Sequence, residues 1–345
     1  MTKLLHDFDH AELSTYLAGC LPNFAGLDTI TRFSGGQSNP TYKITSGKRS
    51  YVLRAKPMGK LLPSAHQVAR EFQVMQALAQ TDVPVPQMYH LSGDNSPLGT
   101  QFFVMELLDG NIHWDPALPV LDSNTRTKMY TAMAETLAAL HCVDPADVGL
   151  SDYGRAGNYF DRQVARWTKQ YRAAETDKIA DIDWVIDWLV DNIPSNDGQV
   201  RIVHGDFRMD NMMFSPDNCR VIGLLDWELS TLGNPMADIA YQCMCLRLPQ
   251  HGLVKGLAGI DRTALGIPSE QDYVAAYCKK RGVDAPDAWG FYMTFAYFRL
   301  IAILQGVIKR ATDGNASNPA SMNMMRAAIP QLADAARAAV TEKLA

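Results

Sequence analysis

The chain has 345 residues, of which 47% are hydrophobic, so it can bury one large core or two modest ones. A formal net charge of -5 without a dense basic run excludes nucleic acid as an expected partner. Charged residues near the start of the sequence argue against a signal peptide. No span has the roughly 18 consecutive apolar residues of a membrane helix, so none is expected. The six cysteines have no C-x-x-C pairing, so we expect reduced thiols in a cytoplasmic protein.

The first part of the chain predicts a small antiparallel sheet. A short helix is expected over residues 8–20, and a second helix, starting near Ser64, carries apolar residues at helical spacing. Glycine-containing and other turn-rich segments separate runs rich in β-branched and aromatic residues. The expected strands cover residues 29–33, 41–45, 51–55, 87–91 and 101–107.

A glycine-containing turn follows the first of these strands. It contains Ser34, Gly35 and Gly36. Glycine has no Cβ and accepts positive φ, so the amides of such a turn can approach a phosphate closely. An ordinary hairpin turn is the alternative interpretation.

The third strand places an apolar residue and a cation on the same face. Because side chains alternate along a strand, Val52 and Arg54 share a face that offers a floor for a base and a charge for phosphates. Arg54 could also be a solvated edge charge, and Lys56 on the same face could compete with it. Glu71 on the following helix could pair with Arg54, although a solvated glutamate is the commoner state on a helix.

The stretch His204–Asn211 carries the strongest chemical signal. Asp206 and Asn211 are five residues apart, and Asp226 follows twenty residues after Asp206. This order and spacing are typical of phosphoryl transfer, where the first acid accepts a hydroxyl proton and the other two residues bind Mg²⁺. Loop acids with no shared role are the alternative.

The segment between the acids predicts a β-hairpin. Residues 212–214 and 220–225 are apolar, and the turn Ser-Pro-Asp-Asn lies between them. Such a hairpin returns Asp226 to the side of Asn211, which is the context the motif needs.

Beyond about residue 107 the pattern changes to helices. The whole chain therefore predicts an α+β fold of two lobes, residues 1–106 and 107–345. A nucleotide is expected in the cleft between them, with the peptide groups from Glu106 to Leu108 at the adenine edge. The expected helices cover residues 123–141, 158–173, 181–193, 236–248, 270–281, 287–309 and 320–344.

Four more stretches accompany the His204–Asn211 loop: Phe33–Asn39, Val52–Pro57, Leu61–His66 and Leu225–Pro235. With them, the chain resembles the aminoglycoside phosphotransferase/choline kinase family over about residues 25–245. The most similar branch comprises kinase domains associated with acyl-CoA dehydrogenase-like proteins. The resemblance implies a protein-kinase-like fold that uses ATP and Mg²⁺. By position it implies Asp206 as the base, Asn211 and Asp226 as Mg²⁺ ligands, Arg54 as the phosphate contact in place of the usual Lys, Glu71 as its partner, and Asp238 as a structural acid.

The expected partner is a small molecule with a hydroxyl group. The family serves aminoglycosides, choline, sugars and hydroxyacyl thioesters, so it leaves the acceptor open. Residues 237–345 contain 12 Lys and Arg against 9 Asp and Glu, which favours a neutral or anionic acceptor over a polycation. A hydroxyacyl-CoA or a hydroxy acid is the preferred class.

Two arginines of the helical part are candidate anchors for this acceptor. Arg299 lies in an apolar run and needs an anionic partner, either the substrate or an internal acid such as Asp238. Arg247 is a weaker candidate, with a surface charge as the alternative.

Three other functions stay open at this point. One is an aminoglycoside O-phosphotransferase, and a second is a nucleotide-binding pseudokinase or scaffold, which the unusual Arg54 favours. The third is a metal-dependent phosphohydrolase that uses His204 and the two aspartates. The sequence indicates neither an ATP or GTP preference nor an oligomeric state.

Overall fold

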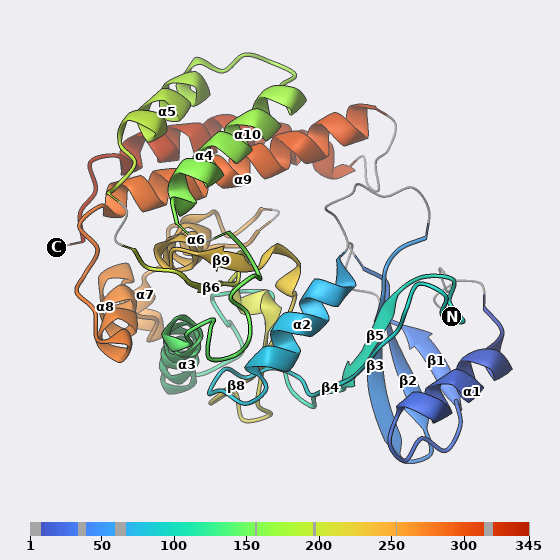
Figure 1. Cartoon of the computed structure of the whole chain (residues 1–345). Coiled ribbons are helices and arrows are strands. Elements are labelled where there is room, and N and C mark those ends of the chain that lie inside the picture. Colours follow the sequence, from blue (N-terminus) through green and yellow to red (C-terminus); the bar gives the residue numbers. More distant parts are fainter. Residues whose placement is uncertain are drawn as a thin grey trace.

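A five-stranded antiparallel sheet forms the N-terminal part of the molecule, and helices form most of the remainder (Figure 1). The computed structural model describes residues 8–33, 39–58, 67–155, 157–195, 198–252, 254–313 and 320–344. The sheet has the order β1-β2-β3-β5-β4, and every pair of neighbours is antiparallel. Its strands are β1 (Thr29–Arg32), β2 (Thr41–Ser46), β3 (Arg49–Ala55), β4 (Met88–Leu91) and β5 (Phe102–Glu106).

The two faces of this sheet have different roles because side chains alternate along each strand. Helix α1 (His10–Cys20) begins at Asp9, whose carboxylate accepts the N–H groups of Ala11 and Glu12. Its Leu13 and Leu17 pack on one face, against a small core. Val52 and Arg54 belong to the opposite face, so the predicted pairing of these two residues on one face is confirmed. That second face is turned toward the remainder of the molecule.

Helix α2 (Val68–Leu78) packs with the larger core of the helical part. Its residues Val68, Phe72, Met75 and Leu78 are buried there, and not in the small core beneath α1. The predicted start near Ser64 lies outside the described residues. By packing, α2 therefore joins the sheet to the helical lobe.

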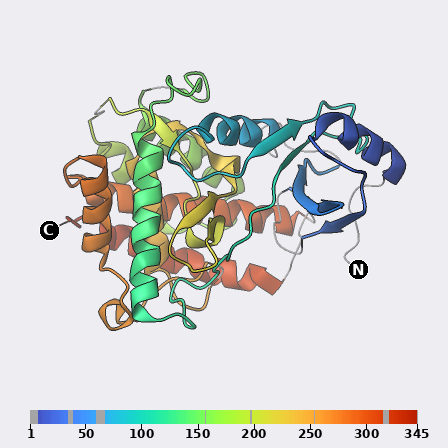
Figure 2. The ribbon, with the colours of Figure 1, turned by 90° about the horizontal axis from the view of Figure 1, so that it is seen from below.

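The helical lobe contains a layer of four packed helices and a smaller pair (Figures 1 and 2). Helices α4, α5, α9 and α10 contact one another in the layer, while α3 packs along α8. Helix α9 is long and apolar enough to cross a membrane, but 83% of its apolar window is buried inside the protein. The helices are α3 (Ser123–Cys142), α4 (Tyr159–Ala174), α5 (Ala180–Asp191), α6 (Met236–Arg247), α7 (Arg262–Leu265), α8 (Glu270–Arg281), α9 (Trp289–Thr312) and α10 (Ala320–Ala339).

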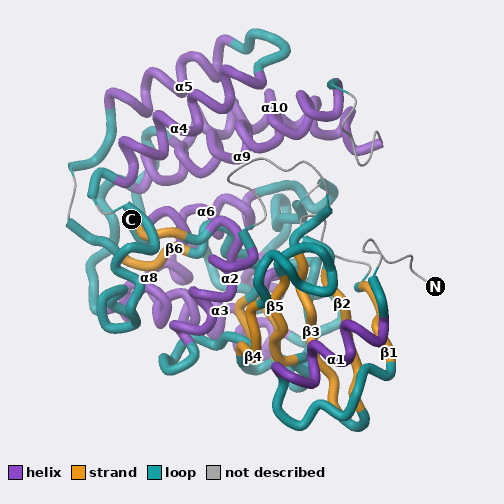
Figure 3. The backbone as a smooth tube through the Cα atoms, turned by 45° about the vertical axis from the view of Figure 1, so that its right-hand side comes forward, coloured by secondary structure: helices purple, strands orange, loops and turns teal. Residues whose placement is uncertain are grey.

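The described residues also form two small two-stranded sheets, and strand β6 (Arg201–Val203) of one of them lies among the helices in Figure 3. The predicted hairpin is confirmed as β7 (Met212–Phe214) paired with β8 (Val221–Leu224). The second pair, β6 (Arg201–Val203) with β9 (Thr231–Gly233), was not predicted. β6 and β9 have three residues each and no tight turn joins them, so the local sequence does not reveal the pair, and the helix α7 is likewise too short to show a period.

Candidate active site

A cavity of about 380 Å³ lies between the second face of the sheet and the β7–β8 hairpin. Its apolar walls come from β3, β5, the segment after β5 and the hairpin, and its polar end contains acids. The residues at the polar end are Arg54, Glu71, Asp210, Asn211 and Asp226, and the others include Phe33, Val52, Met75, Phe103, Met105, Leu107, Leu108, Ile112, Trp114, Met213 and Leu225.

The loop after β6 holds Asp206 in a defined orientation. Tyr241 donates its hydroxyl to Oδ1 (2.9 Å), and Asn211 donates its amide to Oδ2 (2.9 Å). The guanidinium of Arg208 lies 3.2 Å from Oδ1 and also pairs with Asp210 at 3.0 Å. The carboxylate is therefore fixed by two hydrogen bonds and one cation, as a general base requires.

Gly205 has a backbone conformation that other residues rarely adopt. Its φ is +83°, and a Cβ there would lie 2.6 Å from the carbonyl oxygen of Leu229. Both the conformation and the close approach require glycine. This explains physically why glycine precedes Asp206.

A buried carboxylate anchors the same loop from behind. Asp238, at the start of α6, accepts the N–H of His204 (2.7 Å) and of Gly205 (2.8 Å), and His141 lies 3.2 Å from it. Burial opposes its ionisation, but the contact with His141 and these N–H groups keeps the pKa of Asp238 below its usual value. The structural role that the resemblance implied for Asp238 agrees with this geometry.

His204 is a structural histidine and not a proton carrier. Its Nδ1 accepts the N–H of Asp206 (3.2 Å), so the proton is on Nε2, which donates to the Leu225 carbonyl (3.0 Å). Burial lowers the pKa of His204 and keeps the ring neutral. It thereby ties the Asp206 loop to the residue before Asp226.

Asn211 and Asp226 lie together, as the predicted hairpin requires. The N–H of Leu225 donates to the Asn211 carbonyl at 2.9 Å, which places Asp226 beside Asn211. Both amide protons of Asn211 are directed at Asp206, so its Oδ1 is the atom left for a cation. Asp226 has left-handed dihedrals (φ 64°, ψ 61°), a conformation often found at functional sites.

Arg54 makes two ion pairs at once. Its Nε lies 2.9 Å from Oε2 of Glu71, and its Nη2 donates to Oδ1 of Asp226 at 2.7 Å. Glu71 is only 1% exposed and also accepts the amide of Asn39 (2.7 Å). Burial raises the pKa of Glu71 to about 7, while the charge of Arg54 acts in the opposite direction. The predicted pair is thus present, and the solvated alternative for Glu71 is wrong.

The structure places the other residues that were predicted to contact the nucleotide in different ways. Glu106 lines the cavity, but its N–H is taken by the Gln87 carbonyl (2.9 Å). Leu107 and Leu108 also line the cavity. Ser34, Gly35 and Gly36 lie outside the described residues. Lys56 is not among the residues that line the cavity.

Neither candidate anchor for the acceptor lines the cavity, which corrects the expectation. Arg299 is 5% exposed, lies over the rings of Trp167 and Tyr241, and donates to the Gly205 carbonyl. It supports the Asp206 loop from inside the protein and does not pair with Asp238.

Arg247 likewise has a structural position. Its guanidinium pairs with Glu270 (2.5 Å) and Glu342 (2.8 Å). It joins α6 to α8 and to the segment after α10, so it is neither a cavity residue nor a free surface charge.

Sequence reasoning missed Tyr241, Arg208 and Asp210. Tyr241 follows Asp238 by three residues on α6, so both side chains face the same loop. The three-residue spacing from Asp238 could have indicated that Tyr241 also faces the Asp206 loop. Using it, however, requires knowing which face of α6 is turned toward that loop. Burial also raises the pKa of Asp210, against the pull of Arg208.

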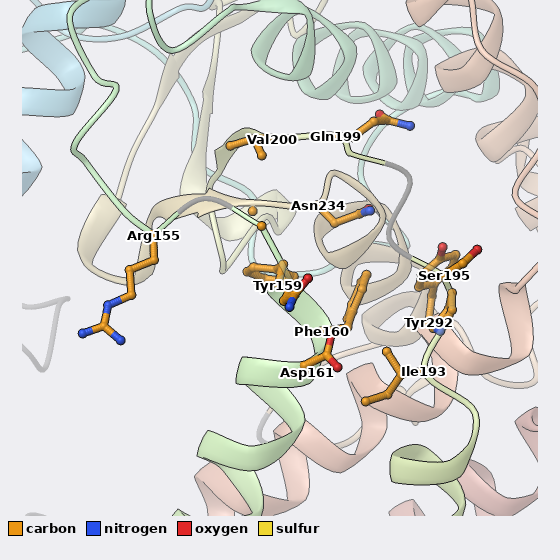
Figure 4. Close-up of a pocket in the computed structure, with 14 residues that line it drawn as sticks. Arg155, Tyr159, Phe160, Asp161, Ile193, Ser195, Gln199, Val200, Asn234 and Tyr292 are labelled. Atoms are coloured by element: carbon orange, nitrogen blue, oxygen red, sulfur yellow. The ribbon is translucent and has the colours of Figure 1, made fainter.

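Two other hollows lack the acids described above. The one in Figure 4 lies among α4, Gln199, Asn234 and Tyr292, and its volume of about 20 Å³ holds little more than one water molecule. An open groove of about 700 Å³ lies between α3 and β8, and it is lined by neither Asn211 nor Asp226, both of which line the cavity at the sheet. The cavity at the sheet is therefore the candidate active site.

Comparison with known proteins agrees with this choice. Residues 29–285 match the family model described as the phosphotransferase enzyme family. Mouse acyl-CoA dehydrogenase family member 10 is 46% identical over 308 residues, which cover 89% of this chain and 29% of that protein. Human acyl-CoA dehydrogenase family member 11 is 40% identical over 319 residues, which cover 91% of this chain and 41% of that protein. The chain thus spans less than half the length of these relatives.

Solved structures show the same fold. A predicted aminoglycoside phosphotransferase from Ralstonia eutropha is 43% identical, with a TM-score of 0.88 and coverage of 98% of this chain and 100% of that one. Aminoglycoside phosphotransferase APH(4)-Ia, in a ternary complex with AMP-PNP and hygromycin B, is 14% identical, with a TM-score of 0.62 and coverage of 96% and 99%. The second likeness concerns the fold alone. The predicted two-lobed α+β architecture is confirmed.

Proposed function

The chain belongs to the phosphotransferase enzyme family, and we propose that it transfers the γ-phosphoryl group of Mg²⁺-ATP to a hydroxyl group of a small molecule. The observation that carries the proposal is the placement of Asp206, Asn211 and Asp226. Asn211 donates to Asp206 and is bonded through its carbonyl to the residue before Asp226, at the acidic end of the cavity. The apolar remainder of the cavity suits the base and ribose.

Asp206 is the proposed general base. A hydroxyl that donates to this carboxylate is oriented toward the γ-phosphorus, and Asp206 accepts its proton as the new O–P bond forms. The bond between the γ-phosphorus and the bridging oxygen breaks, and ADP leaves. Tyr241, Arg208 and Asn211 hold the carboxylate still during this transfer.

The donor set fits Mg²⁺ as a partner of the nucleotide. Within the described ranges, no group of three or more His, Cys, Asp or Glu side chains is placed to hold a metal ion by itself. Mg²⁺ is commonly bound by one or two protein oxygens together with substrate phosphates, and Asn211 Oδ1 and Asp226 would supply the protein share. When bound, the ion would neutralise charge on the phosphate oxygens.

Arg54 is the proposed phosphate contact. Its guanidinium pairs with Glu71 through Nε and with Asp226 through Nη2. Arg54 therefore extends from β3 to one of the proposed Mg²⁺ ligands. Its planar guanidinium contacts the two carboxylates through two different nitrogens, Nε and Nη2, whereas an ammonium would have only one nitrogen for both.

For the acceptor, we propose the hydroxyl of a hydroxyacyl-CoA or of a related hydroxy acid. The relatives at 40–46% identity are named as acyl-CoA dehydrogenases, which act on acyl thioesters by name. The positive balance of residues 237–345 is compatible with an anionic acceptor. An aminoglycoside acceptor is the alternative, since APH(4)-Ia binds hygromycin B on the same fold.

Mass spectrometry tests the proposal. The purified chain is incubated with Mg²⁺-ATP and a panel of hydroxyacyl-CoAs, hydroxy acids and aminoglycosides, beside Asp206→Asn. Asp217→Asn, an exposed acid at the hairpin turn, is the matched control. A product heavier by one phosphoryl group with wild type and D217N, but not D206N, is expected. ADP binding without any product across the panel would instead favour a nucleotide-binding scaffold.

A further inference from the structure

An exposed tryptophan stands at the mouth of the proposed nucleotide cavity. Trp114 lines the cavity and is 65% exposed, and its cavity neighbours Ile112 and Phe33 are also exposed for side chains of their size. A large apolar surface left open to water is costly to the free protein, and such surfaces commonly mark ligand sites.

The backbone around Trp114 is firmly held. Asn111 exchanges two hydrogen bonds of 2.8 Å with the backbone of Phe214. The ring of His113 lies 2.9 Å from Asn218 Oδ1, and Asp115 pairs with Lys255 at 3.0 Å. Trp114 is therefore carried by a segment whose flanking residues are held in place.

The alternation of this segment explains the exposure. Asn111, His113 and Asp115 are directed at the protein, while Ile112 and Trp114 between them line the cavity. The contacts of the odd-numbered residues therefore hold the segment on the protein, while the even-numbered residues lie at the cavity.

The position along the cavity indicates which part of a ligand Trp114 would meet. The acids that would face phosphates and metal lie at one end, with Asn211 and Asp226. Trp114 follows Leu108 by six residues, in the segment after β5 that lines the apolar part of the cavity and is expected to meet the base. We propose that Trp114 packs against the base and ribose of the bound nucleotide and, with Ile112, closes the outer edge of its site.

This inference rests on the proposed function, because it requires a nucleotide in the cavity. Its chemistry is that of an aromatic ring against a purine nucleoside, which tolerates different bases because each has a π-face. The protein is thereby expected to recognise the nucleoside through a side chain that none of its motifs contains.

Binding of Mg²⁺-ADP to the full chain tests the inference by calorimetry. Trp114→Ala is expected to weaken ADP binding by about tenfold, as loss of a base-stacking ring does. Trp184→Ala is the matched control, since Trp184 is also partly exposed but lies on α5, outside the cavity. The melting temperature of each variant verifies that the fold is intact.

Tryptophan fluorescence gives a second readout. ADP should change the emission of the wild-type protein and of W184A, and most of the change should disappear in Trp114→Phe. Equal ADP affinity of W114A and wild type would overturn the inference, as would a defect confined to the KM of the acceptor. Failure of the wild-type chain to bind ADP would instead refute the proposed function, and the inference with it.

Discussion

The hydroxyl of Tyr241 is one of three groups that orient the Asp206 carboxylate, and α6 supplies it from beyond the catalytic loop. Burial raises the pKa of Tyr241 well above its usual value, so the hydroxyl stays protonated and acts as a donor. A neutral donor at Oδ1 restricts the rotation of the carboxylate without removing its charge. Tyr241 is thus a positioning residue that acts through the base.

Tyr241→Phe is expected to lower kcat by about tenfold, since a hydrogen bond to a charged group contributes about 1.5 kcal/mol or more. The Kd for ADP should stay unchanged, because Tyr241 does not line the cavity. Tyr16→Phe in the N-terminal helix is the matched control. Steady-state kinetics with the identified acceptor provide the measurement, and an unchanged kcat would refute the positioning role.

Arg54 is the residue at which the chain departs from the usual lysine of its family. The structure shows what the arginine does, since Nε and Nη2 contact two different carboxylates. A lysine would have to contact Glu71 and Asp226 from a single nitrogen, which cannot take the positions of both Nε and Nη2. The surroundings are therefore fitted to a guanidinium.

Arg54→Lys should weaken binding of Mg²⁺-ADP by roughly tenfold, although it restores the common residue of the family. It should also destabilise the fold by about 1–3 kcal/mol, because Glu71 is buried and loses part of its compensation. Calorimetry with and without Mg²⁺ and urea unfolding measure the two effects. Wild-type affinity in R54K would show that the bridge is dispensable.

At the scale of elements, α3 and α6 hold the catalytic loop through a buried polar chain. Asp238 of α6 contacts His141 of α3, whose Nδ1 is 2.6 Å from the Tyr277 hydroxyl on α8. Arg281 donates to that hydroxyl at 3.2 Å. His141, Asp238 and Tyr277 each have a partner within this network, so three helices set the position of one loop.

The buried histidines make stability depend on pH. Burial lowers the pKa of His141 and of His204, so below about pH 6.5 the unfolded chain binds protons that the folded chain does not. The free energy of unfolding should therefore fall as the pH decreases from 6.5, by up to about 1.4 kcal/mol per pH unit for each histidine.

Urea unfolding between pH 5 and 8 tests this dependence. His141→Gln should be less stable at pH 8, but its stability should decline less steeply below pH 6.5. His251→Gln, at an exposed position, is the control and should keep the wild-type slope. An unchanged slope in H141Q would show that His141 does not carry the effect.

At the scale of the whole molecule, the active site is formed where two cores meet. The sheet has a small core under α1, and α2 packs into the large core of the helical lobe. Arg70 of α2 donates to the Tyr153 carbonyl at 2.6 Å, and the Tyr153 hydroxyl lies 2.6 Å from Ser230 Oγ. Glu71 on α2 is thereby held in place to receive Arg54.

Local patterns predicted most elements and the acids of the site. Asn211 and Asp226 are joined by one hairpin, and Val52 and Arg54 by one strand, so spacing alone placed each pair. The burial of Glu71 against Arg54, and the internal positions of Arg299 and Arg247, depend on contacts between segments that are distant in the sequence. Nothing in the local pattern distinguishes a buried arginine on a backbone carbonyl from one that awaits a substrate.

The central claim is that Asp206 serves as the base of a phosphotransferase. The most direct measurement is acceptor-dependent ADP formation from Mg²⁺-ATP by wild type and by Asp206→Asn, with the ADP affinity of both measured in parallel. If Asp206 is the base, D206N should have a kcat at least about 100-fold lower than wild type, with an unchanged Kd for ADP. Equal rates for the two proteins would contradict it.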